Sequence, residues 1–249
     1  MAKFKSISTA VIALFLISCH TTYQTTGAQY HQYKINTQIP KDSALNAMLQ
    51  PYADSVNRSM NDVVAVAAVN LEKKQPEGTL GNLMADIMLI KGKEKYNRAV
   101  DVSVLNYGGI RLPMIPAGEI TRGKIFELSP FDNIIVLQVI DGKIIKSLLD
   151  HIASSSGGWP ISGMSFQIQN KKAENIKIGG VPLDLNKKYT MALLDYVANG
   201  GDNAAMLRGI PQINGGFLFR DAILEYMREQ KAAGKMITAK IENRITNAQ

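Results

Sequence analysis

The chain has 249 residues, of which 46% are hydrophobic and 20% are charged, and this ordinary globular composition allows one sizeable domain or two small ones. Its single cysteine excludes an intramolecular disulfide and a thiolate metal cluster. The formal charge of +7 includes Lys3 and Lys5 of the first segment, and no stretch interleaves dense Lys and Arg with aromatic residues, so we expect no nucleic-acid partner.

The first segment, MAKFKSISTAVIALFLISCH, predicts a signal peptide over residues 1–18. It has a basic start and an apolar run, residues 10–17, that is shorter than the ~20 residues needed to span a bilayer. The run ends in Leu-Ile-Ser-Cys, which resembles the lipobox of bacterial lipoproteins. The resemblance implies that Cys19 is lipidated and becomes the first residue of a protein anchored in the cell envelope, at the periplasmic face or the cell surface. A buried core cysteine fits this position poorly.

Residues 19–41 are rich in Thr and Gln and poor in large aliphatic side chains, so we expect a lipidated N-terminus followed by a flexible tether. The folded domain is then expected over residues 42–249. Asp42 is a candidate helix cap, because apolar residues at helical spacing follow it as far as Met60, in spite of Pro51. Residues 63–71 predict a strand, and a helix is expected from a Thr79 cap to Gly92.

The remaining elements alternate irregularly. Residues 100–105 predict a strand, helical spacing around residues 120–128 ends before Pro130, and residues 133–158 predict a strand, an Asp-Gly turn at 141–142, a helix and a loop. Strands follow within 163–170 and 174–201, and a C-terminal helix over 217–234 turns four side chains inward: Leu218, Ile223, Leu224 and Met227. Without an internal repeat, this order favours a mixed α/β or α+β domain over a doubly wound sheet.

Loops near the strand ends carry the chemistry. In SVLNYGGIR a strand runs into two glycines, which permit a turn and the close approach of a ligand, and Arg111 can then offer a planar fork of donors. Phe131 follows Pro130 in a polar loop, and Tyr196 stands at a strand end before Asn-Gly-Gly-Asp. Together these loops predict an aromatic clamp for a flat base. The alternatives are a plain turn with a surface arginine, core packing for both rings, and a turn-forming role for Asp202.

Four segments in the same order resemble the C-terminal domain of the 5′-nucleotidase family over roughly residues 42–235: EGTLGNLMADIML, LNYGGIRLPMIPAGEITRGKIFELSPFDNIIVLQVIDGKIIKSLLD, WPISGMSF and YTMALLDYVANGGD. The combination of NxGGIR, PFxN about twenty residues later and ANGGD further on is specific. The resemblance implies a single stand-alone domain with mixed sheets and packed helices, which supplies a nucleotide-specificity pocket.

The resemblance also implies roles for residues. Phe131 and Tyr196, the latter where the family usually has Phe, would sandwich the base, and Asp202 would accept from a ribose hydroxyl. The implied substrate-binding set is Asn106, Gly108, Gly109, Arg111, Phe131, Asn133, Tyr196, Gly200, Gly201 and Asp202. Asn82 and Asp86 are expected to cap a helix or brace loops rather than touch the ligand. Where the family often has an arginine upstream of Gly-Asn, this chain has Lys73, Lys74 and Pro76.

Enzymes of this family hydrolyse phosphate esters with a two-metal centre in a separate N-terminal domain, built from runs such as Asp-x-His and Gly-Asn-His. The chain has neither run, and its three histidines are His20, His31 and His151. His20 and His31 lie in the predicted tether, and His151 is expected at a helix end or on the surface. Gly-x-Ser-x-Gly and the phosphate-loop signature are also absent. We therefore expect no catalytic residue, metal ligand or cofactor in this chain, and divalent metals only in a partner.

The sequence thus predicts a lipid-anchored domain that binds a nucleotide or nucleoside and acts with a separate metallophosphoesterase subunit in nucleotide catabolism. One alternative is a non-catalytic nucleoside-binding or structural lipoprotein of the envelope. A self-sufficient hydrolase that uses different residues is the other.

Overall fold

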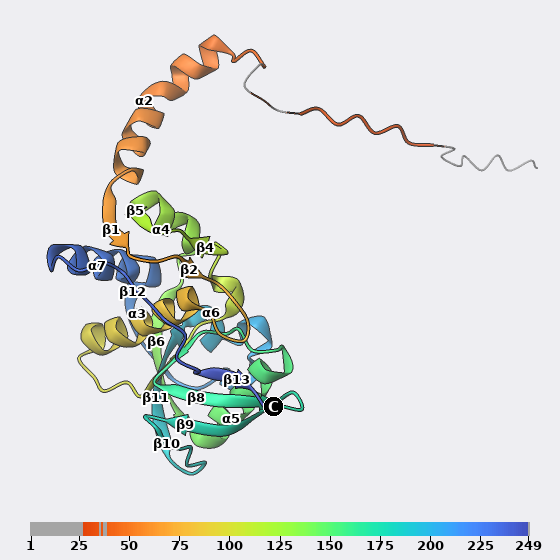
Figure 1. The fold of residues 1–249 in the computed structure, drawn as a ribbon, viewed down its shortest axis with the longest axis vertical. Coiled ribbons are helices and arrows are strands. Elements are labelled where there is room, and N and C mark those ends of the chain that lie inside the picture. The colour runs from red at the N-terminus through yellow and green to blue at the C-terminus, as the bar shows by residue number, and fades with distance from the viewer. Residues whose placement is uncertain (1–26, 35, 37–38, 249) are drawn as a thin grey trace, which may run out of the picture. The chain divides into compact units, whose positions relative to one another are not determined.

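The computed structural model describes residues 27–34, 36 and 39–248 (Figure 1), so the predicted signal peptide and Cys19 lie outside the described residues. The chain divides into two units between Met48 and Leu49, and the predicted domain boundary at residue 42 stays a prediction. Helix α2 (Ser43–Met60) begins as expected, because Asp42 Oδ1 accepts from the backbone N–H groups of Ala44 and Leu45 at 3.0 Å each. None of the helices in the described part is long and apolar enough to cross a membrane.

A mixed five-stranded sheet forms the centre of residues 49–248, in the order β12 (Gln212–Leu218), β6 (Ile134–Asp141), β11 (Lys188–Leu194), β3 (Val102–Val104) and β7 (Ile161–Ser162). Strands β11 and β3 are parallel, and the other neighbours are antiparallel. Four consecutive residues of β6, Ile135 to Gln138, are buried. Both faces of the sheet are therefore covered at its centre.

Helices and a second sheet provide this cover (Figure 1). Helix α3 (Thr79–Tyr96) packs on β3, β7 and β11, and α7 (Phe219–Ala232) packs on α3. Helix α5 (Gly142–Ser154) contacts both β6 and β9. The second sheet has the order β10 (Val181–Pro182), β9 (Lys172–Ile178), β8 (Met164–Gln169) and β13 (Ile245–Asn247).

Short elements complete the fold. Two antiparallel ribbons pair β1 (Val63–Ala67) with β5 (Gly118–Thr121) and β2 (Leu71–Glu72) with β4 (Met114–Ile115). The short helices are α4 (Arg122–Leu128), α6 (Asp195–Ala198), η1 (Tyr107–Gly109), η2 (Gly201–Asn203) and η3 (Ala205–Leu207). The mixed α/β class and the mixed sheets predicted from the sequence are confirmed.

Several predicted boundaries in the first half of the domain were wrong. The strand expected over residues 63–71 ends at Ala67, and a second strand, β2, begins at Leu71. Ile120 lies in β5 rather than in a helix. Thr79 does not cap α3, because its Oγ1 accepts from the Glu72 N–H at 2.8 Å and Gly78 is the N-cap residue. The same helix continues past Gly92. A Cβ at that position would lie 3.2 Å from the Ala192 Cβ, so the glycine permits close helix–sheet packing rather than ending the helix.

Two further boundaries differ near the centre and the C-terminus. Gly142 begins α5 directly after Asp141, the last residue of β6. The turn predicted at residues 141–142 is therefore not formed, and the strand continues directly into the helix. Leu218 ends β12 instead of lying in the C-terminal helix, and β12 itself was not predicted. The other three inward positions were predicted correctly, since Ile223, Leu224 and Met227 are buried in α7.

Candidate functional site

Sheet topology brings three loops to one edge of the five-stranded sheet. The parallel strands β3 and β11 end side by side, and the chain continues from them into Asn106 and Asp195. Strand β6 runs antiparallel to β11, with Ile135 opposite Leu194, so its N-terminal end and the preceding loop lie at the same edge. Because neighbouring parallel strands end at the same edge, loops far apart in the sequence meet there.

A pocket of about 270 Å³ opens among these loops. It is lined by eight of the ten predicted residues: Asn106, Gly108, Gly109, Arg111, Phe131, Asn133, Tyr196 and Asp202. Phe131 is 44% exposed and Tyr196 is 46% exposed, so the alternative that both rings belong to the core is wrong. Both rings can offer surface to a ligand in the free protein.

Arg111 lines the pocket and is exposed to solvent. Its guanidinium carbon is 5.7 Å from the centre of the Phe131 ring, within the range of a cation–π contact, and Nη1 donates to the Gly108 carbonyl at 3.4 Å. The backbone N–H of Arg111 donates to the Leu128 carbonyl at 2.9 Å, which fixes the end of the glycine loop. Most of the guanidinium donors remain available to a ligand.

Asp202 receives two side-chain hydrogen bonds at the pocket wall. Its Oδ2 accepts from Asn106 Nδ2 at 2.7 Å, and its Oδ1 accepts from the Tyr196 hydroxyl at 2.8 Å. The carboxylate raises the pKa of Tyr196, chiefly because it accepts the hydroxyl proton. Each carboxylate oxygen keeps a second lone pair, so Asp202 can still accept from hydroxyl groups of a ligand.

The two aromatic loops are held in place by residues that the sequence analysis did not single out. Asp195 Oδ1 accepts from the Ile134 N–H at 3.0 Å and from the Tyr196 N–H at 2.9 Å, which ties the end of the Phe131 loop to the Tyr196 segment. From α7, Arg220 Nη1 donates to the Pro130 carbonyl at 3.0 Å and Nη2 pairs with Asp132 at 2.6 Å. The two rings therefore project from loops with fixed spacing.

Gly200 and Gly201 do not line the pocket, but both permit its shape. A Cβ at Gly201 would lie 2.4 Å from the Tyr196 Cε1, so only glycine lets the ring lie against this backbone. Gly200 has φ +86, and a Cβ there would lie 2.3 Å from the Arg208 Nε. In the free protein the two glycines contribute to the placement of Tyr196 and Asp202, and their predicted contact with a ligand stays a prediction.

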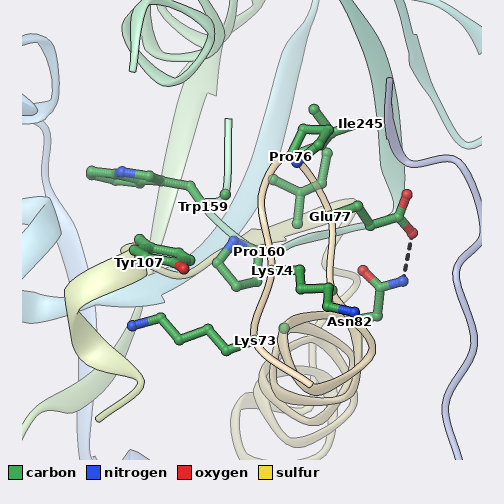
Figure 2. Close-up of a pocket in the computed structure, with 13 residues that line it drawn as sticks. Lys73, Lys74, Pro76, Glu77, Asn82, Tyr107, Trp159, Pro160 and Ile245 are labelled. Carbon is green, nitrogen blue, oxygen red and sulfur yellow. Dashed lines mark hydrogen bonds between the residues drawn. The ribbon is translucent and has the colours of Figure 1, made fainter. Parts of the chain in front are cut away.

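The lysines upstream of α3 lie beside a second, smaller hollow (Figure 2). Its volume of about 10 Å³ is room for roughly one water. Lys73 Nζ donates to the Ile110 carbonyl at 2.8 Å and lies 3.9 Å from the centre of the Tyr107 ring, and Lys74 pairs with Glu72. Burial, followed by the positive charge of Arg111, lowers the pKa of Lys73. Neither lysine lines the larger pocket.

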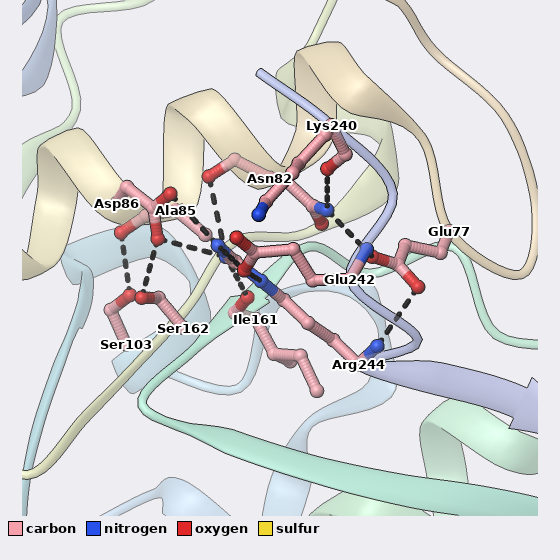
Figure 3. Close-up of polar contacts among 10 residues, drawn as sticks. All are labelled: Glu77, Asn82, Ala85, Asp86, Ser103, Ile161, Ser162, Lys240, Glu242 and Arg244. Carbon is pink, nitrogen blue, oxygen red and sulfur yellow. Dashed lines mark hydrogen bonds and ion pairs between the residues drawn. The ribbon is translucent and has the colours of Figure 1, made fainter.

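Asn82 and Asp86 brace the chain, as predicted (Figure 3). Neither side chain lines the larger pocket. Asp86 forms a bidentate pair with Arg244, with both N–O distances at 2.8 Å, and accepts from the Ser162 hydroxyl at 2.6 Å. Asn82 Nδ2 donates to Glu77 Oε1 and to the Lys240 carbonyl. These contacts fasten the C-terminal segment to α3.

His151 lies near the C-terminal end of α5, as predicted, but it contacts the pocket wall from behind. Its Nε2 is 2.9 Å from the Asp202 carbonyl oxygen, and its ring packs edge-on against Trp159 with centres 5.6 Å apart. A carbonyl only accepts hydrogen bonds, so this Nε2 carries the proton and donates.

Among the described His, Cys, Asp and Glu side chains, one group comes close enough to share a cation: Glu94, Glu225 and Glu229. The ammonium of the buried Lys91 lies among them, with Nζ–O distances of 2.7, 3.3 and 2.6 Å. Although burial lowers the pKa of Lys91, the hydrogen bonds that its ammonium donates to these carboxylates outweigh that effect and raise the pKa. The cluster is an internal ion-pair network that joins α3 to α7.

Comparisons with known proteins identify the family of this sequence. Residues 58–209 match the family model described as 5′-nucleotidase, C-terminal domain. A 5′-nucleotidase from Vibrio vulnificus is 30% identical over 205 residues, which are 78% of this chain and 36% of that protein. Protein UshA of Escherichia coli is 32% identical over 146 residues, which are 57% of this chain and 26% of UshA.

The fold is also similar to solved structures. The crystal structure of a 5′-nucleotidase precursor from Thermus thermophilus superposes with a TM-score of 0.71 at 29% identity, over 84% of this chain and 44% of that one. A NAD nucleotidase from Haemophilus influenzae, at 16% identity and a TM-score of 0.63, shares the fold. The chain spans about a quarter to a third of the length of the curated relatives named above.

Proposed function

Because this chain belongs to the 5′-nucleotidase C-terminal domain family, we propose that its pocket binds the nucleoside part of a nucleotide. One observation carries the proposal: eight residues spread from Asn106 to Asp202 line a single pocket with two aromatic rings, a guanidinium and a carboxylate. Its volume of about 270 Å³ is close to the lower end of the ~300–1,000 Å³ typical of small-molecule sites.

The chemistry of the pocket suits the parts of a nucleoside. A flat base can stack on the exposed faces of Phe131 and Tyr196, and such stacking contributes about 1–3 kcal/mol per base. The Asp202 carboxylate can accept from ribose hydroxyls while it keeps its bonds to Asn106 and Tyr196. Arg111 offers charged donors to a base edge or to an anionic group of the ligand.

Hydrolysis, in this proposal, belongs to a pair of proteins. The chain would supply substrate specificity, and a separately encoded metallophosphoesterase subunit would supply the two metal ions. Support comes from the match of residues 58–209 to the C-terminal domain model of the family and from the absence of Asp-x-His and Gly-Asn-His runs in the sequence. The Lys91 ammonium already lies among the three carboxylates of the Glu94, Glu225 and Glu229 cluster, at the place in the described domain that a cation would take.

Calorimetric titration of the purified protein against a panel of nucleosides and nucleoside mono-, di- and triphosphates tests the binding proposal. We expect saturable one-site binding by at least one class, weakened in the Phe131→Ala variant. With Mn²⁺ or Zn²⁺ added, the protein alone should release no phosphate from nucleoside monophosphates. Absence of binding across the panel would contradict the proposed ligand, and robust turnover by the protein alone would contradict the division of labour.

We further propose that the protein is held at the cell envelope through a lipid on Cys19. The lipobox-like segment before it supports this placement. A Cys19→Ser variant should stay unlipidated and leave the membrane fraction, or accumulate as the precursor. Unchanged mass and fractionation of the variant would contradict the anchor, and a Ser18→Ala variant, which keeps a small residue before the cysteine, serves as the control.

A further inference from the structure

Asp202 is held by contacts from three segments of the chain, two of which are distant from it in the sequence. Asn106, which precedes η1, and Tyr196, in α6, each hydrogen-bond one carboxylate oxygen. His151, in α5, donates through Nε2 to the backbone carbonyl of the same residue at 2.9 Å. The side chain and the peptide of Asp202 are therefore fixed independently.

The backbone needs this support. Asp202 has φ 49 and ψ 38 and Asn203 has φ 64, so two successive residues with a Cβ adopt the left-handed conformation. Such residues are disfavoured there and persist where their surroundings determine the conformation. The hydrogen bond from His151 fixes the orientation of the peptide group between these two residues. Loss of this hydrogen bond would remove a restraint on a peptide group that directly follows the Cα atom carrying the carboxylate side chain.

His151 is itself well positioned to hold this peptide. Its ring packs edge-on against Trp159, which is 5% exposed. The imidazole comes from a helix whose Ile152 and Leu149 are fully buried in the core. The donor nitrogen therefore stands on a rigid element behind the pocket, and His151 is absent from the residues that line it.

We propose that His151 is a positioning residue for ligand binding, which acts by holding Asp202 in the orientation that accepts ribose hydroxyls. The inference rests on the proposed function, because it gives His151 a role in nucleoside binding although its side chain does not line the pocket. Loss of the donor should reduce affinity for ligands with ribose hydroxyls and leave affinity for ligands without them unchanged. A histidine needed only for folding would not produce that difference.

Two variants separate the hydrogen bond from the packing. His151→Phe keeps an aromatic ring against Trp159 and removes the donor, and His151→Gln restores a donor N–H without the ring. Calorimetry with purified full-length protein compares a ribonucleoside that the wild type binds with its 2′,3′-dideoxy analogue. For His151→Phe we expect roughly three- to tenfold weaker ribonucleoside binding, the usual worth of one hydrogen bond, with unchanged binding of the analogue. His151→Gln should recover most of the affinity.

The outcomes distinguish this inference from the proposed function. If the wild type binds no nucleoside, the proposed function and this inference both fail. If the wild type binds but His151→Phe binds ribonucleoside equally well, or loses both ligands to the same extent, the positioning role alone is overturned. Where circular dichroism shows that His151→Phe is unfolded, His151→Leu replaces it with the same expectation. In an Asp202→Ala background, His151→Phe should have no further effect on affinity, and an additive loss would overturn the coupling.

Discussion

Replacement of Tyr196 by alanine should weaken nucleoside binding by about 1–3 kcal/mol, or about five- to 150-fold, because it removes one stacking surface. The ring is 46% exposed in the free protein, so roughly half of its surface is available for a ligand to cover. Tyr196→Phe keeps the ring and removes only the hydroxyl, which donates to Asp202 Oδ1 at 2.8 Å and accepts from the Asp202 N–H at 3.3 Å. The Tyr196→Phe variant should lose less binding free energy, about 0.5–1.5 kcal/mol.

The assay is calorimetric titration of the three proteins with one nucleoside, paired with thermal unfolding in the absence of ligand. Because the Tyr196 ring is half exposed and packs on the Gly201 backbone, Tyr196→Ala should cost about 1 kcal/mol of unfolding free energy, or a fall in Tm of roughly 2–4 °C. Unchanged affinity together with a much larger fall in Tm would refute the stacking role and make Tyr196 a structural residue.

Substitutions at three other positions test a charge at the pocket, the support of its loops, and an ion pair between α3 and α7. Arg111→Ala should weaken nucleoside binding by about 1.5–3 kcal/mol, as expected for the loss of a charge-assisted hydrogen bond. Arg111→Lys should recover only part of that binding free energy. The same calorimetric titration measures both variants. Asp195→Ala should weaken nucleoside binding and lower Tm, because it frees both aromatic loops. Asp195→Asn keeps the acceptor oxygen and should bind the nucleoside nearly as well as the wild type. Equal affinities and equal Tm values of the two variants would argue against a role of Asp195 in holding the loops. The hydrogen bond from Lys95 lowers the pKa of Glu225 below 4.5, so its contribution to stability is present above about pH 4.5 and is lost as the pH falls through the folded-state pKa. Urea unfolding at a series of pH values should therefore show a smaller acid-induced loss of stability for Glu225→Gln than for the wild type, and identical profiles would contradict the ion pair.

The residues lining the pocket were predictable because each stands in a short loop directly beside an apolar strand. Gly-Gly before Arg111, Pro before Phe131 and Asn-Gly-Gly before Asp202 are local signals that need no knowledge of the fold. Their convergence was expected from resemblance. In the structure it follows from the parallel pairing of β3 with β11, two strands that are separated by more than eighty residues and carry no sequence signal for their pairing.

The supporting residues could not be predicted in the same way. Arg220 reaches the Phe131 loop from a helix about ninety residues downstream, and His151 reaches Asp202 from α5. From the sequence alone, a single arginine or histidine on a helix cannot be distinguished from an ordinary surface residue, because its tertiary contacts are not known. Asp195 offered a weak signal, since it is an acidic residue between a buried strand and an aromatic side chain. The prediction of Thr79 as a helix cap was wrong for a similar reason: its hydroxyl accepts a hydrogen bond from the backbone N–H of Glu72 in β2, rather than from its own helix.

The most direct test of the account is a crystal structure of the protein with a bound nucleoside monophosphate. We expect electron density for the base against the rings of Phe131 and Tyr196, with ribose hydroxyls within hydrogen-bond distance of the Asp202 carboxylate and Arg111 in contact with the ligand. Density for the nucleotide at another surface, with this pocket filled only by water at a saturating ligand concentration, would contradict it.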